Sequence, residues 1–213
     1  AGVRPFDPME LNPVIGINTL VGGFKGKNKD LVGLDLRIKL TDKGYLYGQF
    51  ATDGPSDQRY SYQAGIRWFD VIRKDIHVQV EYNAAQPFMY TNDPTKLAYK
   101  HSALPLAHPM GAYFNETVAI VDAGFGRVIG QVKLVLATYH TDPSTNEVYG
   151  GSLDRPDLPV NGPVGPVMQE LTYMDVNTSY LLNPNTNLRL FIGVQRRGLT
   201  HSTDNEQSTY LYF

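Results

Sequence analysis

The chain has 213 residues, a formal net charge of −2 and no cysteine. This length suits one domain, the balanced charge argues against a nucleic-acid partner, and the absence of cysteine excludes disulfides and thiolate metal sites. No apolar run approaches the roughly 20 residues of a membrane helix.

Alternating apolar and polar residues run through the chain and predict β-strands. Segment 34–40 reads LDLRIKL, segment 76–83 reads IHVQVEYN and segment 188–195 reads LRLFIGVQ. Successive side chains of a strand point to opposite faces of the sheet, so each segment has one apolar face and one polar face. The pattern predicts about ten strands, at 13–22, 29–40, 45–52, 59–70, 75–90, 116–125, 127–141, 168–182, 187–197 and 206–213.

The lengths of these strands and of their connections favour a membrane barrel. Several strands exceed ten residues, whereas strands in soluble proteins usually have five or six, and a tilted strand needs about 9–11 residues to cross a bilayer. Short connections at 41–44, 71–74, 126 and 183–186 alternate with longer ones at 23–28, 53–58, 91–115, 142–167 and 198–205. Outer-membrane barrels have the same asymmetry, with short periplasmic turns and long outside loops.

Aromatic residues are concentrated at the ends of the predicted strands. Those near the short turns are Tyr45, Trp68, Phe69, Phe125 and Tyr180, and those near the long loops are Tyr60, Tyr62, Tyr90, Phe114, Tyr139 and Tyr173. Membrane barrels place aromatic residues at both interfaces. We therefore interpret the chain as all-β, an antiparallel up-and-down transmembrane β-barrel, with a soluble β-sandwich as the alternative.

In such a barrel the apolar face of each strand meets lipid and the polar face lines the lumen. The predicted polar network of the lumen consists of Arg67, His77, Gln79, Glu81, Asn83, Lys133, Asp175 and Arg189. A barrel of about ten strands is narrow, so these side chains would largely fill it. Because buried charges need partners, we expect the acids Glu81 and Asp175 to pair with Arg67, Lys133 or Arg189.

Residues 76–116 carry a more specific signal. The strand with Glu81, Tyr82 and Asn83 is followed by Pro87, by Tyr90 and by the run PLAHP at 105–109, which continues through Gly111 to Glu116. This segment resembles Bacteroidota outer-membrane barrels of the capsule assembly Wzi-like family, some members of which are labelled gliding motility protein RemB. Gln86, Met110 and Tyr113 depart from the family pattern, which has Arg, Leu and Asn there. The resemblance implies that residues 1–213 are a single outer-membrane β-barrel region of a longer chain, and part of a larger barrel.

The segment 101–116, HSALPLAHPMGAYFNE, offers two histidines but no metal-ligand spacing, and no catalytic motif occurs in the chain. We therefore expect no catalytic residue, no metal and no cofactor. The prolines predict a rigid loop that caps the barrel mouth. Aromatic and polar residues of this loop are the candidates for binding a glycan: Tyr90, Asn92, Asp93, Tyr99, His101 and His108.

The strand pattern predicts a non-enzymatic protein of the outer membrane, and the resemblance implies a Gram-negative, Bacteroidota-like cell. Its partners would be outer-membrane lipid, surface polysaccharide, and other outer-membrane or periplasmic proteins. The first hypothesis is binding or assembly of capsular polysaccharide. The alternatives are a structural subunit of a gliding or secretion complex and, least favoured, a narrow diffusion pore.

Overall fold

The computed structural model describes residues 31–53, 59–91, 98–101, 104–143, 147–153, 162, 165–201 and 204–213. One antiparallel sheet of nine strands contains β1 (Val32–Thr41), β2 (Gly44–Thr52), β3 (Tyr60–Phe69), β4 (Ile76–Ala85), β7 (Phe114–Phe125), β8 (Val128–Thr141), β9 (Val167–Asn183), β10 (Leu188–His201) and β11 (Asn205–Tyr212). Two short strands, β5 (Lys100–His101) and β6 (Leu104–Pro105), pair with each other inside the connection from β4 to β7. None of the described segments is a helix that could span a membrane.

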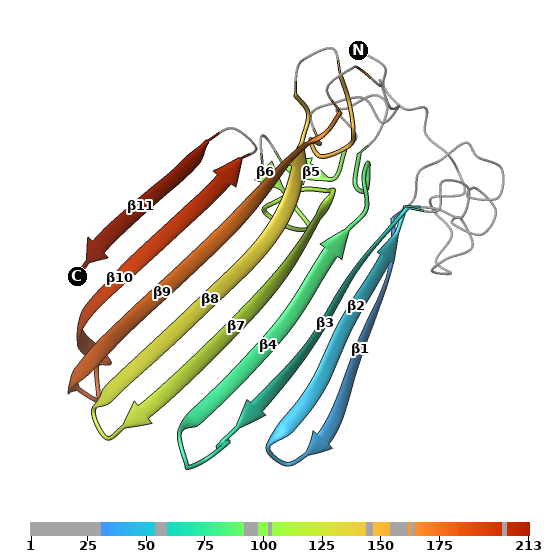
Figure 1. Ribbon diagram of the computed structural model, residues 1–213. Coiled ribbons are helices and arrows are strands. Elements are labelled where there is room, and N and C mark those ends of the chain that lie inside the picture. The colour runs from blue at the N-terminus through green and yellow to red at the C-terminus, as the bar shows by residue number, and fades with distance from the viewer. Residues whose placement is uncertain are drawn as a thin grey trace.

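The strands of the large sheet follow one another in chain order, and each pairs antiparallel with the next. Figure 1 shows a strongly curved sheet with the short turns along its lower end and the longer connections at its upper end. We call these the turn end and the loop end. The all-β, up-and-down arrangement and the alternation of short and long connections are therefore confirmed.

The structure departs most from the sequence prediction in three places. β4 ends at Ala85 rather than near residue 90, because a turn follows in which Phe88 and Tyr90 have positive φ angles of 62° and 70°. β10 extends to His201, beyond the predicted end at 197. The β5–β6 hairpin was not predicted, and the predicted strand at 13–22 lies outside the described residues.

The sheet is open within the described part of the chain. β1 and β11 are its two end strands, and neither pairs with the other. A closed barrel is therefore not observed, and closure remains a prediction.

Cross-strand register divides the side chains of the sheet into two faces. Glu81 lies opposite Val118, Asn83 opposite Glu116, and Asp175 opposite both Lys133 and Gln195. We call the face that carries these residues the inner face. The outer face carries the alternate positions, among them Val80 and Val176.

Burial on these faces is the reverse of that in a soluble sheet. On β9, Asp175 is 7% exposed, whereas the neighbouring Val176 is 39% exposed. Leu34, Leu36 and Ile38 on β1 and Leu188, Leu190 and Ile192 on β10 are exposed as well, although both faces of the strand are exposed in these two segments. The outer face is thus apolar and open, while the inner face is polar and partly enclosed.

Curvature brings inner-face side chains together across more than one strand. The Tyr47 hydroxyl on β2 reaches Glu81 on β4, and the Tyr212 hydroxyl on β11 reaches Asp175 on β9. Each of these tyrosine rings lies over a cross-strand glycine, Gly65 or Gly193, where an added Cβ would overlap the ring. Glycine at these positions therefore lets the ring lie flat on the sheet and extend its hydroxyl to the next strand.

The predicted aromatic bands are only partly on the outer face. Phe50, Tyr60, Tyr62 and Tyr82 form a continuous row of ring contacts there, with successive centroids 5.9–6.4 Å apart, near the loop end. By register, Trp68, Phe125 and Tyr180 share the outer face near the turn end. The remaining predicted aromatics of the strands lie on the inner face: Tyr45, Phe69, Phe114, Tyr139 and Tyr173.

Candidate functional site

The connection from β4 to β7 folds against the inner face at the loop end. We call its described residues, 86–91, 98–101 and 104–113, the cap. Met89 is fully buried, and it belongs to a hydrophobic cluster with Ala85, Ala112, Phe114 and Leu153. Some of the best-buried apolar side chains among the described residues therefore hold the cap to the sheet, and capping of a barrel mouth stays a prediction.

Backbone hydrogen bonds also attach the cap to its neighbours. The Phe88 N–H donates to the Gly150 carbonyl at 2.9 Å, and the His140 N–H donates to the Tyr113 carbonyl at 3.0 Å. Gly150 has a φ of +86°, and a Cβ there would overlap Phe88. The connection from β8 to β9 therefore packs against the cap through a position that only glycine fits.

His108 is held by both ring nitrogens. Its Nδ1 accepts the Met110 N–H at 3.2 Å, so its Nε2 carries the proton and donates to Glu116 at 3.0 Å. The ring also stacks on Phe114 with a centroid distance of 4.3 Å. His108 thus positions the cap on β7, and neither ring nitrogen is left for a ligand.

A chain of hydrogen bonds continues from His108 along the inner face. The Asn83 amide donates to Glu116 and to Glu81, both at 2.9 Å. Glu81 also accepts from the Tyr47 hydroxyl at 2.6 Å, and that hydroxyl accepts from Gln79 at 2.9 Å. This network links the cap to the middle of strands β2 and β4.

A second polar cluster surrounds Asp175. Its carboxylate accepts from the Tyr173 hydroxyl, the Asn177 amide, the Gln195 amide and the Tyr212 hydroxyl, at 2.7–3.1 Å. Four neutral donors from three strands thus satisfy one buried carboxylate.

The expectation that cations would neutralise the lumen acids is wrong for this part of the chain. Among the described residues, Arg67, Lys133 and Arg189 form no ion pair with Glu81 or Asp175. Arg67 lies 5.2 Å from the centroid of the Phe69 ring, and Arg189 donates to the Asn187 side chain at 2.9 Å. The physical reason is reach, because tyrosine hydroxyls two strands away and amides on the same or the next strand are already within hydrogen-bond distance of the acids.

The remaining members of the predicted lumen network differ in their partners. His77 lies edge-on against Phe69 at a centroid distance of 5.1 Å, with a buried Nδ1 that has no hydrogen-bond partner within the described chain. Lys133 acts on Glu116 electrostatically without direct contact. Arg189 is exposed beside the turn end.

The predicted glycan-binding residues do not converge on one site. Tyr90 is half-buried and shares a hydrogen bond with the Ser61 hydroxyl, while its ring centroid lies 6.0 Å from that of the exposed Tyr99. Burial raises the pKa of Tyr90 above its ordinary value of 10.0, so its hydroxyl stays protonated at neutral pH. His101 is exposed on β5, and Asn92 and Asp93 lie outside the described residues.

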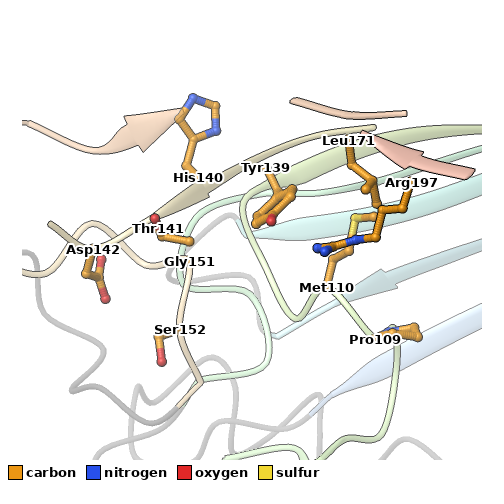
Figure 2. Close-up of a pocket in the computed structure, with 10 residues that line it drawn as sticks. All are labelled: Pro109, Met110, Tyr139, His140, Thr141, Asp142, Gly151, Ser152, Leu171 and Arg197. Carbon is orange, nitrogen blue, oxygen red and sulfur yellow. The ribbon is translucent and has the colours of Figure 1, made fainter. Parts of the chain in front are cut away.

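A pocket of about 600 Å³ lies instead at the edge of the cap (Figure 2). Strands β8, β9 and β10 supply Tyr139, Leu171 and Arg197, and the cap supplies Pro109 and Met110. The other lining residues are His140, Thr141, Asp142, Gly151 and Ser152. Figure 2 shows Arg197, Tyr139 and Met110 grouped together, while Asp142 lies on the opposite side and His140 points away.

The sequence interpretation missed this pocket because its residues come from five separate segments. One signal was available: Arg197 is in phase with Gln195 and Asp175 on the polar face, at the loop end of a long strand. No cluster of three or more His, Cys, Asp or Glu side chains that could hold a metal ion occurs in the described ranges.

Comparisons with known protein families, curated proteins and solved structures found no match to this chain.

Proposed function

We propose that this chain forms the wall of a non-enzymatic, plugged β-barrel of the outer membrane that holds surface polysaccharide at its loop end. The observation that carries the proposal is the reversed burial of the sheet. Apolar side chains are exposed along the outer face, while carboxylates and amides are enclosed on the inner face. In water this arrangement is unfavourable by about 25 cal/mol for each Å² of apolar surface left exposed, whereas lipid removes the penalty.

The dimensions of the sheet support the same proposal. Its strands have 8–17 residues, and a tilted strand crosses the hydrocarbon layer with about 9–11. The row of rings from Phe50 to Tyr82 would lie at one membrane interface, with Trp68, Phe125 and Tyr180 toward the other. Pairing of β1 and β11 with further strands would satisfy their free edges and close the barrel, as the bilayer requires.

The cap supports a plugged barrel rather than a pore. Met89, Ala112 and Leu153 fix it against the inner face, and His108 ties it to Glu116. The polysaccharide assignment rests on the resemblance of residues 76–116 to the capsule assembly Wzi-like family and on the aromatic and polar residues at the loop end.

A second candidate, a subunit of a gliding or secretion complex, is favoured by one feature of the outer face. A hollow of about 490 Å³ is bordered by Leu36, Ile38, Leu46, Ile66 and Val80, above the small residues Gly48 and Ala64. Such a depression would also suit an apolar segment of a neighbouring membrane protein.

Native extraction distinguishes the two candidates. The protein would be extracted gently from outer membranes and purified, and its carbohydrate and protein partners would be analysed by mass spectrometry. Bound polysaccharide that is lost in Tyr99→Ala, with the chain still in the membrane, is the expected result. A stoichiometric protein partner without carbohydrate would replace the first candidate with the second, and recovery from the aqueous fraction would overturn both.

A further inference from the structure

Arg197 differs from the other described arginines because its exposed guanidinium makes no hydrogen bond, ion pair or aromatic-ring contact within the described chain. The others are occupied. Arg37, Arg67 and Arg73 lie over aromatic rings, and Arg59, Arg127, Arg189 and Arg196 donate hydrogen bonds. Arg197 therefore presents a complete set of donors to the pocket in Figure 2.

The surroundings of Arg197 define what the pocket could hold. The Tyr139 ring, Met110 and Leu171 supply apolar surface, and Thr141 and Ser152 supply hydroxyl groups. The volume of about 600 Å³ lies within the range of roughly 300–1,000 Å³ that small-molecule sites occupy. A ligand that fits would have a flat or ring-shaped body, hydroxyl groups and one anionic group.

Two acidic residues limit where the anionic group can lie. Asp142 is on the side of the pocket away from Arg197, and its Oδ1 accepts the Tyr149 N–H at 2.7 Å. Glu206 on β11 acts on the Tyr139 hydroxyl electrostatically, as Arg197 does, but forms no ion pair with Arg197 among the described residues. The pocket thus has a positive end at Arg197 and a negative end at Asp142.

We propose that this pocket binds an acidic sugar, a uronate residue of a polysaccharide, with its carboxylate on Arg197 and the face of its ring on Tyr139. A guanidinium binds a carboxylate through two parallel hydrogen bonds, which fixes both position and orientation. Sugar hydroxyl groups would lie toward Thr141, Ser152 and Asp142. This inference rests on the proposed function, because it names the class of saccharide that the loop end holds.

The test compares two matched ligands on the full chain in detergent. A trimeric oligogalacturonate carries carboxylates, and its fully methyl-esterified form has the same rings without charge. Arg197→Gln removes the proposed contact. Arg196→Gln is the matched control, because Arg196 lies on the outer face and binds Gln207 at 3.0 Å.

We expect the charged trimer to bind at least about tenfold more tightly than its ester. Arg197→Gln should weaken binding of the charged trimer by about the same factor, and Arg196→Gln should leave its affinity unchanged. Equal binding of the ester, unchanged by Arg197→Gln, would overturn the inference and leave polysaccharide binding intact. Competition by acetate or inorganic phosphate at concentrations equal to the trimer would show a general anion site and would also overturn it. Failure of both trimers to bind the folded chain in detergent would count against the inference and the polysaccharide assignment together.

Discussion

The outer and inner faces of the sheet differ in polarity and burial, although the same strands form both. The outer face exposes Leu36 on β1, Val80 on β4 and Val176 on β9, whereas the inner face satisfies the Glu81 and Asp175 carboxylates with neutral donors. In a soluble sheet the apolar face forms the core. Here the buried hydrophobic cluster of the described residues lies between the cap and the loop end of the sheet, and the apolar outer face is left exposed, which agrees with the proposed lipid environment.

The largest expected effect comes from a charge on the outer face. Val80→Arg places a guanidinium where lipid is proposed, and should cost roughly 2–4 kcal/mol in folding free energy in lipid vesicles. Gln79→Arg is the matched control on the same strand, because Gln79 lies on the inner face within 3.5 Å of the Glu81 carboxylate. Urea titration in vesicles measures both. Equal stability of the two variants would contradict the distinction between the faces.

Removing the buried anchor of the cap should have a similar or smaller effect, confined to the loop end. Met89 is fully buried, so Met89→Ala should cost about 2–4 kcal/mol through lost contacts and the cavity that remains. Chymotrypsin cleavage after the exposed Tyr99 reports opening of the cap, and far-UV circular dichroism reports the strands. Faster cleavage with an unchanged strand signal is expected, whereas loss of both together would show that the cap and the sheet unfold as one unit.

The polar clusters of the inner face should contribute less than the cap anchor. Asp175→Ala leaves several hydrogen-bond donors without their acceptor and should lower the free energy of unfolding by about 1–2 kcal/mol. Asp122→Ala is a milder control, because Asp122 accepts from Gln131 at 2.7 Å and has no such ring of donors around it. Equilibrium unfolding in detergent measures the difference, and a cost no larger than that of Asp122→Ala would contradict the assigned role of Asp175.

The smallest expected effect is an alkaline weakening of the cap. Because burial raises the pKa of Tyr90 above 10.0, the unfolded chain loses this proton at lower pH than the folded chain. The stabilisation is present below pH 10 and is lost as the pH rises through the folded-state pKa. Tyr90→Phe should remove that part of the pH dependence of Tyr99 cleavage, whereas an identical pH profile would contradict it.

Alternation in the sequence was sufficient to predict the two faces. The pattern of LRLFIGVQ already separates Leu190 and Ile192 from Gln195, because a strand has only two sides. The long strands and the unequal lengths of the connections were also predicted from the sequence. Membrane insertion and closure of the barrel remain predictions.

Contacts between distant segments could not be predicted from the sequence. Nothing in the local pattern indicates that Glu81 is satisfied by Tyr47, since the choice between a hydroxyl and a cation depends on sheet curvature. The sequence made His108 a candidate glycan-binding residue, but Met110 and Glu116 occupy both of its ring nitrogens in the structure. The pocket at Arg197 required β10 and the cap to be placed together.

The most direct test of the reversed sheet uses the absence of cysteine from the chain. Single cysteines at Gln131, Val132, Lys133 and Leu134 on β8 would carry an environment-sensitive fluorophore, in outer membranes containing nitroxide-labelled lipid. We predict that the probes at Val132 and Leu134 are quenched and those at Gln131 and Lys133 are not, because register assigns them to opposite faces. Fluorescence typical of water at all four positions, with no alternation in quenching, would contradict the assignment of the two faces.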